Sequence, residues 1–206
     1  MPTLCYSPGA CSLAPHIVLN EGGKPFELKR VNLAEGEQRT ETYKKIHPQG
    51  RVPALILDDG TVITENTAIL PYLGKAFGLW PKDAMGEAKA MSLIGLFAAS
   101  VHPAWAHISR PGRYATDESA HATLQATGIA AFTDYLRQID AMLEGRDWLL
   151  GTYSVVDPYA FVFYTWAKRR QKDFPLAELH NLARFRDRMV ARPAVAKTLA
   201  TENVVA

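Results

Sequence analysis

The sequence predicts two domains of different classes, a small α/β domain over residues 1–78 and an all-helical domain over residues 85–206. In the first eighty residues, runs of β-forming residues alternate with helical stripes. Beyond residue 85 the β-branched alternation disappears and only helical periodicity remains. At 206 residues, the chain is long enough to bury the cores of two small domains.

The chain opens with a strand, a turn and a helix. Thr3–Tyr6 is rich in β-formers, and Ser7-Pro8-Gly9 supplies the turn. The helix must begin at about Cys11–Ser12, because Pro15 is tolerated only in a first turn, where its missing N–H has no helical partner. Gly22-Gly23 ends this helix.

The middle of the first domain predicts a strand, a short helix and a hairpin. The strand is expected over Phe26–Leu33 and the helix over Thr40–Ile46, which ends before a proline because that position disfavours helical backbone. Val52–Leu57 and Val62–Thr64 then flank Asp58-Asp59-Gly60, whose Asp-Gly pair is typical of a hairpin turn.

A helix that follows Glu65-Asn66 completes this domain, with an apolar stripe at Ile69, Leu70, Leu73 and Phe77. The resulting order, β-α-β-α-β-β-α with a closing antiparallel hairpin, is the thioredoxin-like arrangement. Pro53 would open a central strand, where a proline costs a ladder hydrogen bond. By frequency alone its peptide bond would be trans. In this pattern we expect a cis bond, which turns the backbone of Val52 toward the first helix, where an extended peptide could pair with it.

The second domain is predicted to be helical throughout. Residues 78–84, which include Trp80-Pro81, form the linker. Ser154 and Asp157 form a capping box, and Arg192-Pro193 ends the last long helix and permits a short final one. The predicted helices are Ala88–Val101, Leu124–Leu143, Val156–Lys172 and Leu182–Val190.

Cys11 is the clearest candidate for chemistry. A thiol at a helix start faces unpaired backbone N–H groups and the positive end of the helix dipole, which lowers its pKa and favours the reactive thiolate. The alternative is a small, inert residue in the core, since free cysteines are often buried.

Composition and charge exclude several classes. The net charge of +2 and the basic run at residues 168–172, broken by acidic neighbours, indicate a solvated helix face and no nucleic-acid site. No apolar run reaches the length of a bilayer span, and the N-terminus has no signal peptide, so we expect a cytoplasmic protein. Cys5 and Cys11 form neither a disulfide framework nor a C-x-x-C site. No metal is expected.

Several short motifs occur in a fixed order along the chain. They are Tyr6–Leu13, His47–Pro53, Thr64-Glu65-Asn66, His102 with Trp105, Ser154–Asp157 and Arg192–Val195. With these motifs, the chain resembles the cytosolic glutathione transferases, specifically the bacterial beta class, over nearly its whole length. The Ser-Ser-x-Ser/Cys-x-Arg signature of the zeta-like maleylacetoacetate isomerases is absent.

The resemblance implies that glutathione, as a substrate, binds to the first domain. Cys11 would lie beside its sulfur, with Ser12 and the helix start stabilising the thiolate. Val52, before the cis Pro53, would pair with the cysteinyl backbone. Glu65 and Asn66 would hold the γ-glutamyl ammonium and carboxylate, the latter at a helix N-terminus.

The helical domain would supply the rest of the site. His102 would approach the thiol, and Trp105 and Trp166 would wall the site of an apolar electrophile. Tyr159 and Tyr164 are weaker candidates, better explained by core packing. His107 has no counterpart in the family pattern and is expected to be structural.

The chain departs from the family pattern at three positions. The position of a family lysine that meets the glycyl carboxylate falls near Gly36, where this chain has no lysine, and Arg51 or Arg39 could replace that charge. Gly95 replaces an asparagine, and Ser100 replaces an acidic residue that reaches the ligand of the neighbouring subunit. These departures predict weaker or altered glutathione binding.

The resemblance implies a homodimeric glutathione S-transferase that conjugates glutathione to small apolar electrophiles in detoxification. Two alternatives stay open at this point. One is a glutathione-dependent thiol–disulfide oxidoreductase that acts through Cys11, and the other is a non-catalytic module that binds glutathione or another ligand.

Overall fold

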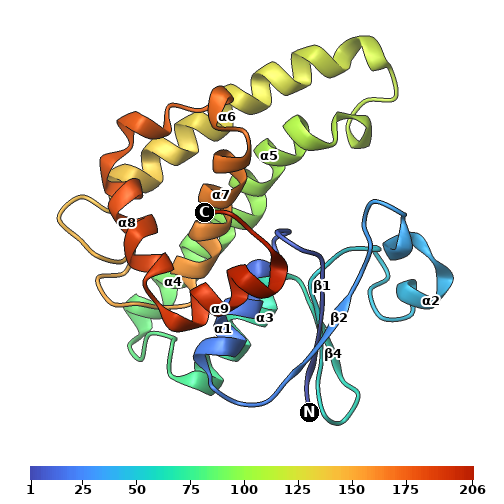
Figure 1. The fold of residues 1–206 in the computed structure, drawn as a ribbon, viewed down its shortest axis with the longest axis vertical. Coiled ribbons are helices and arrows are strands. Elements are labelled where there is room, and N and C mark those ends of the chain that lie inside the picture. Colours follow the sequence, from blue (N-terminus) through green and yellow to red (C-terminus); the bar gives the residue numbers. More distant parts are fainter.

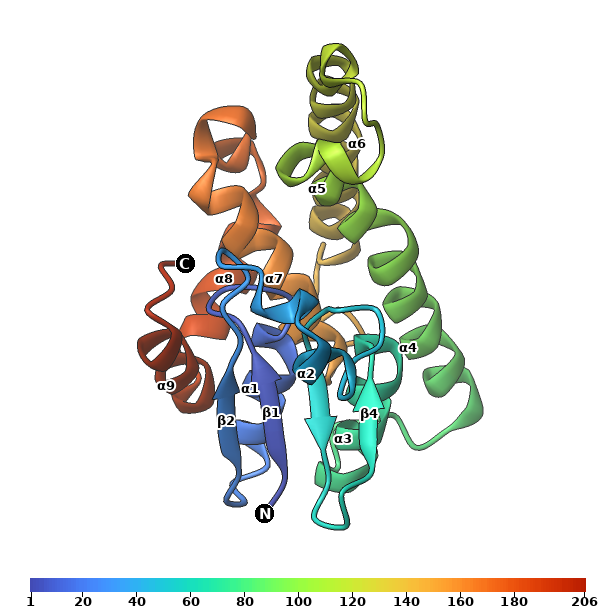
Figure 2. The ribbon, with the colours of Figure 1, turned by 90° about the vertical axis from the view of Figure 1, so that its right-hand side faces the viewer.

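A four-stranded sheet with the order β2-β1-β3-β4 forms the base of the molecule in a computed structural model, which describes all 206 residues (Figures 1 and 2). β1 pairs in parallel with β2 and antiparallel with β3, and β3 and β4 form the closing hairpin. The predicted element order and the thioredoxin-like arrangement are therefore confirmed. The strands are β1 Thr3–Tyr6, β2 Glu27–Arg30, β3 Ala54–Ile56 and β4 Val62–Thr64.

Helices cover both faces of the sheet (Figure 1). α1 (Leu13–Glu21) and α3 (Asn66–Phe77) pack together on one face, and the short α2 (Glu41–Lys44) lies on the other. On the α2 side, a small core contains Cys5, Val31, Tyr43, Val52 and Ala54. The side chains of β1 thus face apolar neighbours on both sides, as expected for a central strand.

Two predicted strands are shorter in the structure. β2 covers only four of the eight residues of Phe26–Leu33, because it is an edge strand that pairs on one side and leaves most of its side chains exposed. β3 begins after the Val52–Pro53 bond, which is cis as predicted. Gly60, in the hairpin turn, has a φ of +84°, a conformation that glycine adopts without strain.

The helical domain rises above the sheet, and its α5–α6 hairpin projects furthest (Figure 2). Its helices are α4 Ala84–Leu96, α5 His102–Ser109, α6 His121–Met142, α7 Val156–Arg169, α8 His180–Val190 and α9 Pro193–Glu202. Short 3₁₀ turns are η1 Glu37–Arg39, η3 Pro111–Arg113, η4 Glu118–Ala120, η5 Gln171–Asp173 and η6 Leu176–Glu178.

The prediction that a helix ends at Val101 is wrong. A π-helical turn, η2 (Phe97–Val101), joins α4 to α5 in one continuous helix. Pro103 falls in the first turn of α5, where its missing N–H and its ring are accommodated by the widened π turn. His102 and Trp105 therefore lie on the second half of a long helix.

The continuous helix Ala84–Ser109 also differs from the expectation of no bilayer-length segment. It has 26 residues, and its most apolar window has a mean hydropathy of 1.2, so by length and composition alone it could cross a membrane. One such helix is weak evidence for a membrane span. In the structure it contacts α3, α6 and α7.

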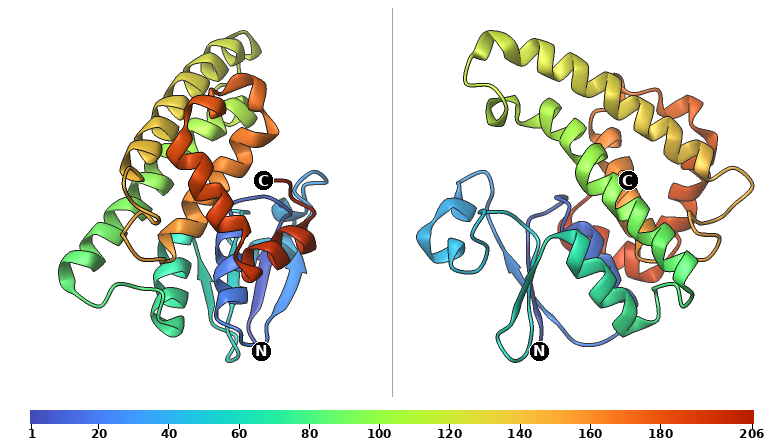
Figure 3. Two further views of the ribbon diagram at one scale, coloured as in Figure 1. Left: turned by 60° about the vertical axis from the view of Figure 1, so that its left-hand side comes forward. Right: turned by 180° about the vertical axis from the view of Figure 1, so that it is seen from behind.

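The core of the helical domain is α7, which is buried from Val156 to Ala167 and packs on α1 of the other domain. The predicted capping contact is present, since the Ser154 N–H donates to the Asp157 carboxylate at 2.8 Å. α9 then returns to the α/β domain and lies beside α1, as both views in Figure 3 show. This return places the C-terminal segment against the loop after β1.

Candidate active site

A cavity of about 1000 Å³ lies between the two domains. Its walls come from the loop after β1, the turn before β3, the start of α3, helix α5 and the buried helix α7. Most residues predicted for the site line it: Cys11, Arg51, Val52, Pro53, Glu65, Asn66, His102, Trp105 and Trp166. Residues from the two halves of the chain thus meet in one cavity.

The loop after β1 is held by the helical domain. Gly9 donates its N–H to Glu202 at 2.7 Å and accepts a hydrogen bond from the indole N–H of Trp166 at 2.9 Å. Its φ is +62°, and a Cβ at this position would overlap the guanidinium of Arg169. The positive φ favours glycine here, because a residue with a side chain would be strained in this conformation.

Cys11 lies nearly buried at the base of the cavity. Its Sγ donates to the carbonyl oxygen of Val52 at 3.3 Å, and its own carbonyl accepts from the Asn66 side-chain amide at 3.0 Å. Burial raises the pKa of the Cys11 thiol to about 12, although the charge of Arg110 acts in the opposite direction. The predicted lowering of the pKa is therefore wrong, since desolvation outweighs the helix start.

Ser12, which the sequence places beside the glutathione sulfur, does not reach the cavity. It is fully buried, and its hydroxyl accepts from the Ser7 N–H and donates to the Ser7 carbonyl, both at 3.2 Å. It therefore stabilises the loop after β1 from the side that faces away from the cavity.

Glu65 and Asn66 stand at the start of α3. Both line the cavity, so the first-turn N–H groups of a twelve-residue helix begin at its wall. Glu65 has a φ of +67°, an uncommon conformation for a residue with a side chain. Its carboxylate lies 4.0 Å from the Nε2 of His47, a buried residue that the sequence placed in a motif without a role.

His102 reaches the cavity from the opposite side. Its ring contacts Trp166 edge-on at 5.0 Å between centroids. Burial, and then the charges of Arg110 and Arg51, lower the pKa of His102 to about 4. At neutral pH the imidazole is uncharged and can accept a proton.

Trp105 and Trp166 stack with 5.3 Å between ring centroids, as expected for an aromatic wall. Trp166 is buried, so Trp105 provides the more accessible surface. Tyr159 also lines the cavity, whereas Tyr164 does not. His107 lies outside it, in edge contact with Tyr114.

The sequence predicted only one of the six arginines in the cavity wall, Arg51, as a site residue. Of the other five, Arg39 was named only as a charge that could replace the lysine missing near Gly36. The wall carries Arg30, Arg39, Arg51, Arg110, Arg113 and Arg169. They come from five separate segments, so no local pattern marks them. Nor does the structure contain a cluster of three His, Cys, Asp or Glu side chains that could hold a metal.

Comparisons with known proteins agree with this geometry. Residues 9–76 match the family model described as the glutathione S-transferase N-terminal domain, and residues 104–193 match its C-terminal domain. The glutathione S-transferase GstA of Escherichia coli O157:H7 is 33% identical over 98% of each chain. The chain belongs to the glutathione S-transferase family.

Solved structures of other glutathione transferases share the whole fold. A Sulfitobacter homologue with bound glutathione has 31% identity and a TM-score of 0.92, covering 100% of this chain and 99% of the other. A Sphingomonas chungbukensis enzyme, described as bacterial beta class, has 32% identity and a TM-score of 0.85, covering 98% of this chain and 100% of its own. This chain thus shares both domains of the glutathione transferase architecture.

Proposed function

We propose that this chain is a beta-class glutathione transferase that joins the glutathione thiolate to small electrophiles with an apolar body. The observation that carries the proposal is the convergence of Cys11, Val52, Glu65, His102 and Trp105 in one interdomain cavity. Likeness to the Sphingomonas beta-class enzyme supports the class.

Glutathione would bind along the first domain. The backbone of Val52, which lines the cavity, suits the cysteinyl unit, and the carboxylate of Glu65 suits the γ-glutamyl ammonium. The start of α3 suits the γ-glutamyl carboxylate, because first-turn N–H groups bind anions. Arg39 and Arg51 would replace the lysine that is missing near Gly36 and hold the glycyl carboxylate.

The same residues would favour the ionised sulfur of glutathione. The Cys11 thiol stays protonated at neutral pH, so it can donate a hydrogen bond to the glutathione thiolate. Neutral His102 can take the thiol proton. The thiolate then attacks an electrophilic carbon held against Trp105.

The raised pKa of Cys11 favours conjugation over thiol–disulfide exchange, because exchange through Cys11 requires its thiolate. The two reactions are separable by substitution. In Cys11→Ala, conjugation of an aryl halide should persist in part, since the nucleophile is glutathione itself. Any disulfide exchange through Cys11 should be abolished, and exchange equal to that of the wild type would remove this residue from the alternative mechanism.

His102→Ala should lower the conjugation rate at neutral pH by at most about 10²-fold, the lower end of the effect of a positioned base, because a pKa of about 4 makes His102 a weak base. Raising the pH should restore part of the rate, because the glutathione thiol then ionises without help. The measurement is kcat/KM for glutathione with 1-chloro-2,4-dinitrobenzene from pH 6 to 9. Retention on immobilised glutathione without any turnover would support the binding-module alternative.

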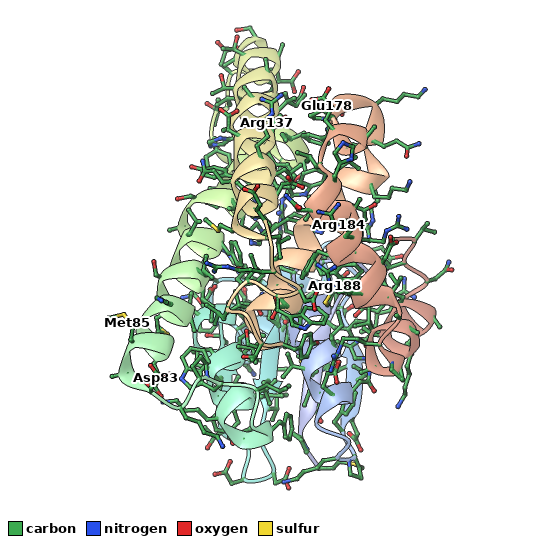
Figure 4. The ribbon with its side chains drawn as sticks, turned by 90° about the vertical axis from the view of Figure 1, so that its left-hand side faces the viewer. Asp83, Met85, Arg137, Glu178, Arg184 and Arg188 are labelled. Atoms are coloured by element: carbon green, nitrogen blue, oxygen red, sulfur yellow. The ribbon has the colours of Figure 1, made fainter.

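We also infer a domain division between residues 78 and 85 and a homodimer. Side chains of Tyr72 on α3 and of Met85 and Met91 on α4 are 44%, 65% and 47% exposed, and Figure 4 shows Met85 on the outer face. A second copy would cover this apolar surface. Light scattering should give about twice the chain mass of 22.8 kDa, and the monomer mass at micromolar concentration would contradict the dimer.

A further inference from the structure

The cavity has a strong positive charge that glutathione alone does not explain. Six arginines line it, against one carboxylate, that of Glu65. The whole chain has a net charge of only +2, so the cavity concentrates the positive charge of the protein. No arginine in the wall belongs to an ion pair, whereas Arg137, Arg170 and Arg192 elsewhere do.

Four of these arginines divide between the two walls. Arg39 and Arg51 belong to the first domain, beside the backbone of Val52. Arg110 and Arg113 belong to the helical domain, at the C-terminal end of α5 and in the η3 turn. Glutathione bound along the first domain would engage the former pair, which leaves Arg110 and Arg113 for a different anion.

Arg110 is the better placed of this second pair. Its Nε is buried and has no hydrogen-bond partner within the protein. Burial dominates the pKa shifts of Cys11 and His102, and Arg110 exerts the largest charge effect on each. Arg110 lines the same cavity as these two residues, and a buried unpaired donor is stabilised by an acceptor on a ligand.

Trp105 and Arg110 lie in the same cavity, and Arg110 follows the last residue of α5. An aromatic second substrate held against Trp105 would thus share the cavity with Arg110. A carboxylate is the small substituent that matches a guanidinium in planar, two-point geometry.

We propose that the second substrate is an acidic electrophile, an aromatic or unsaturated body whose carboxylate pairs with Arg110 and Arg113. This inference rests on the proposed transferase function and specifies its substrate class. With an aryl chloride, the glutathione thiolate forms a C–S bond to the carbon that carries chlorine. The C–Cl bond breaks with its electron pair on chloride, and the thiol proton passes to solvent.

The test compares two substrates that differ in one charge, 4-chloro-3,5-dinitrobenzoate and its methyl ester. Each rate is divided by the uncatalysed rate with glutathione, because the ester is intrinsically more reactive. We expect the wild type to prefer the carboxylate at least tenfold in normalised kcat/KM. Raising the salt from 0.05 to 0.5 M should weaken this preference, since screening acts on the charged substrate alone.

Arg110→Gln should raise KM for the carboxylate about tenfold and leave KM for the ester and for glutathione within twofold. Arg113→Gln should act in the same direction with a smaller effect, and Arg110→Lys should keep part of the preference. The matched control is Arg137→Gln, which removes an exposed arginine from α6 (Figure 4) and should change neither substrate. Thermal unfolding of each variant confirms that it is folded.

Three outcomes would overturn the inference. The first is an equal normalised kcat/KM of the wild type for the carboxylate and the ester. The second is an equal loss of kcat/KM for both substrates in Arg110→Gln, and the third is a rise in KM for glutathione alone in that variant. Binding of the two finished glutathione conjugates, measured by Trp fluorescence, distinguishes a failure of this inference from a failure of the proposed transferase function. Tighter binding of the acidic conjugate without turnover would support the acidic subsite and contradict catalysis, whereas equal binding would contradict the subsite itself.

Discussion

The two walls of the cavity are built in opposite ways. The loop Ser7–Cys11 is held by hydrogen bonds to buried groups, and one of these, on Glu202, lies 193 residues away in the chain. The facing rim, η3 with Tyr114, contains no buried residue, and its arginine, Arg113, has no ion-pair partner. The loop wall therefore depends on the fold for its shape, whereas the rim presents free side chains.

This difference indicates a division of labour. Glutathione is the same in every reaction, so a rigid wall built from backbone groups suits it. The partner substrate is recognised by side chains that can change without loss of the fold. Substitutions that affect the loop Ser7–Cys11 should then act mainly on stability, and substitutions at the rim mainly on substrate choice.

Glu202→Ala should give the largest loss of stability. It leaves the Gly9 N–H and the Nδ1 of His16 without their buried acceptor, both at 2.7 Å in the structure. Removing one partner of such a buried pair costs about 3 kcal/mol, which corresponds to a fall in Tm of about 6–12 °C.

The control for this change is Glu178→Ala, which removes an exposed carboxylate on η6 (Figure 4). It should alter the free energy of unfolding by less than about 0.5 kcal/mol. Calorimetry on both variants tests whether Glu202 stabilises the loop after β1. Equal Tm values for Glu202→Ala and Glu178→Ala would show that α9 does not support the loop.

His102, which lies between the two walls, should link stability to pH. Its pKa of about 4 in the folded state lies below the value of 6.5 for an exposed histidine, so the unfolded state binds the proton more readily. The contribution of neutral His102 to the free energy of unfolding is fully present above pH 6.5 and is lost as the pH falls toward 4.

Between pH 7.5 and 5, the wild type should therefore lose about 1–2 kcal/mol more stability than His102→Gln. Denaturant unfolding at both pH values measures this difference. Because the other histidines are common to both proteins, parallel pH profiles would mean that His102 is solvated and charged in the folded state.

Arg51→Gln should have the smallest effect. The side chain is exposed and forms no ion pair, so Tm should not change, whereas the affinity for glutathione should fall about fivefold, or by about 1 kcal/mol. Calorimetric titration with glutathione measures the change, with Arg184→Gln on the outer face of α8 as the control (Figure 4). An unchanged affinity would assign the glycyl carboxylate to another group, such as Arg39.

Local chemistry was sufficient for the element order and for much of the site. Hairpin, proline and glycine signals located β3, β4 and the ends of α1, because such signals act over a few residues. They failed at Val101, where the π turn lets a helix continue past a proline. Family motifs named Cys11, His102 and Trp105, and the cavity brings all three together.

Only the tertiary structure decided the electrostatics of the site and the support of its loop. The pKa of Cys11 depends on burial by both domains, which reverses what its position near a helix start predicts. The hydrogen bond from Gly9 to Glu202 and the effect of the Arg110 charge on Cys11 join segments that are distant in the chain. Sequence patterns carry local backbone preferences, whereas desolvation and long-range pairing depend on which surfaces the finished fold brings into contact.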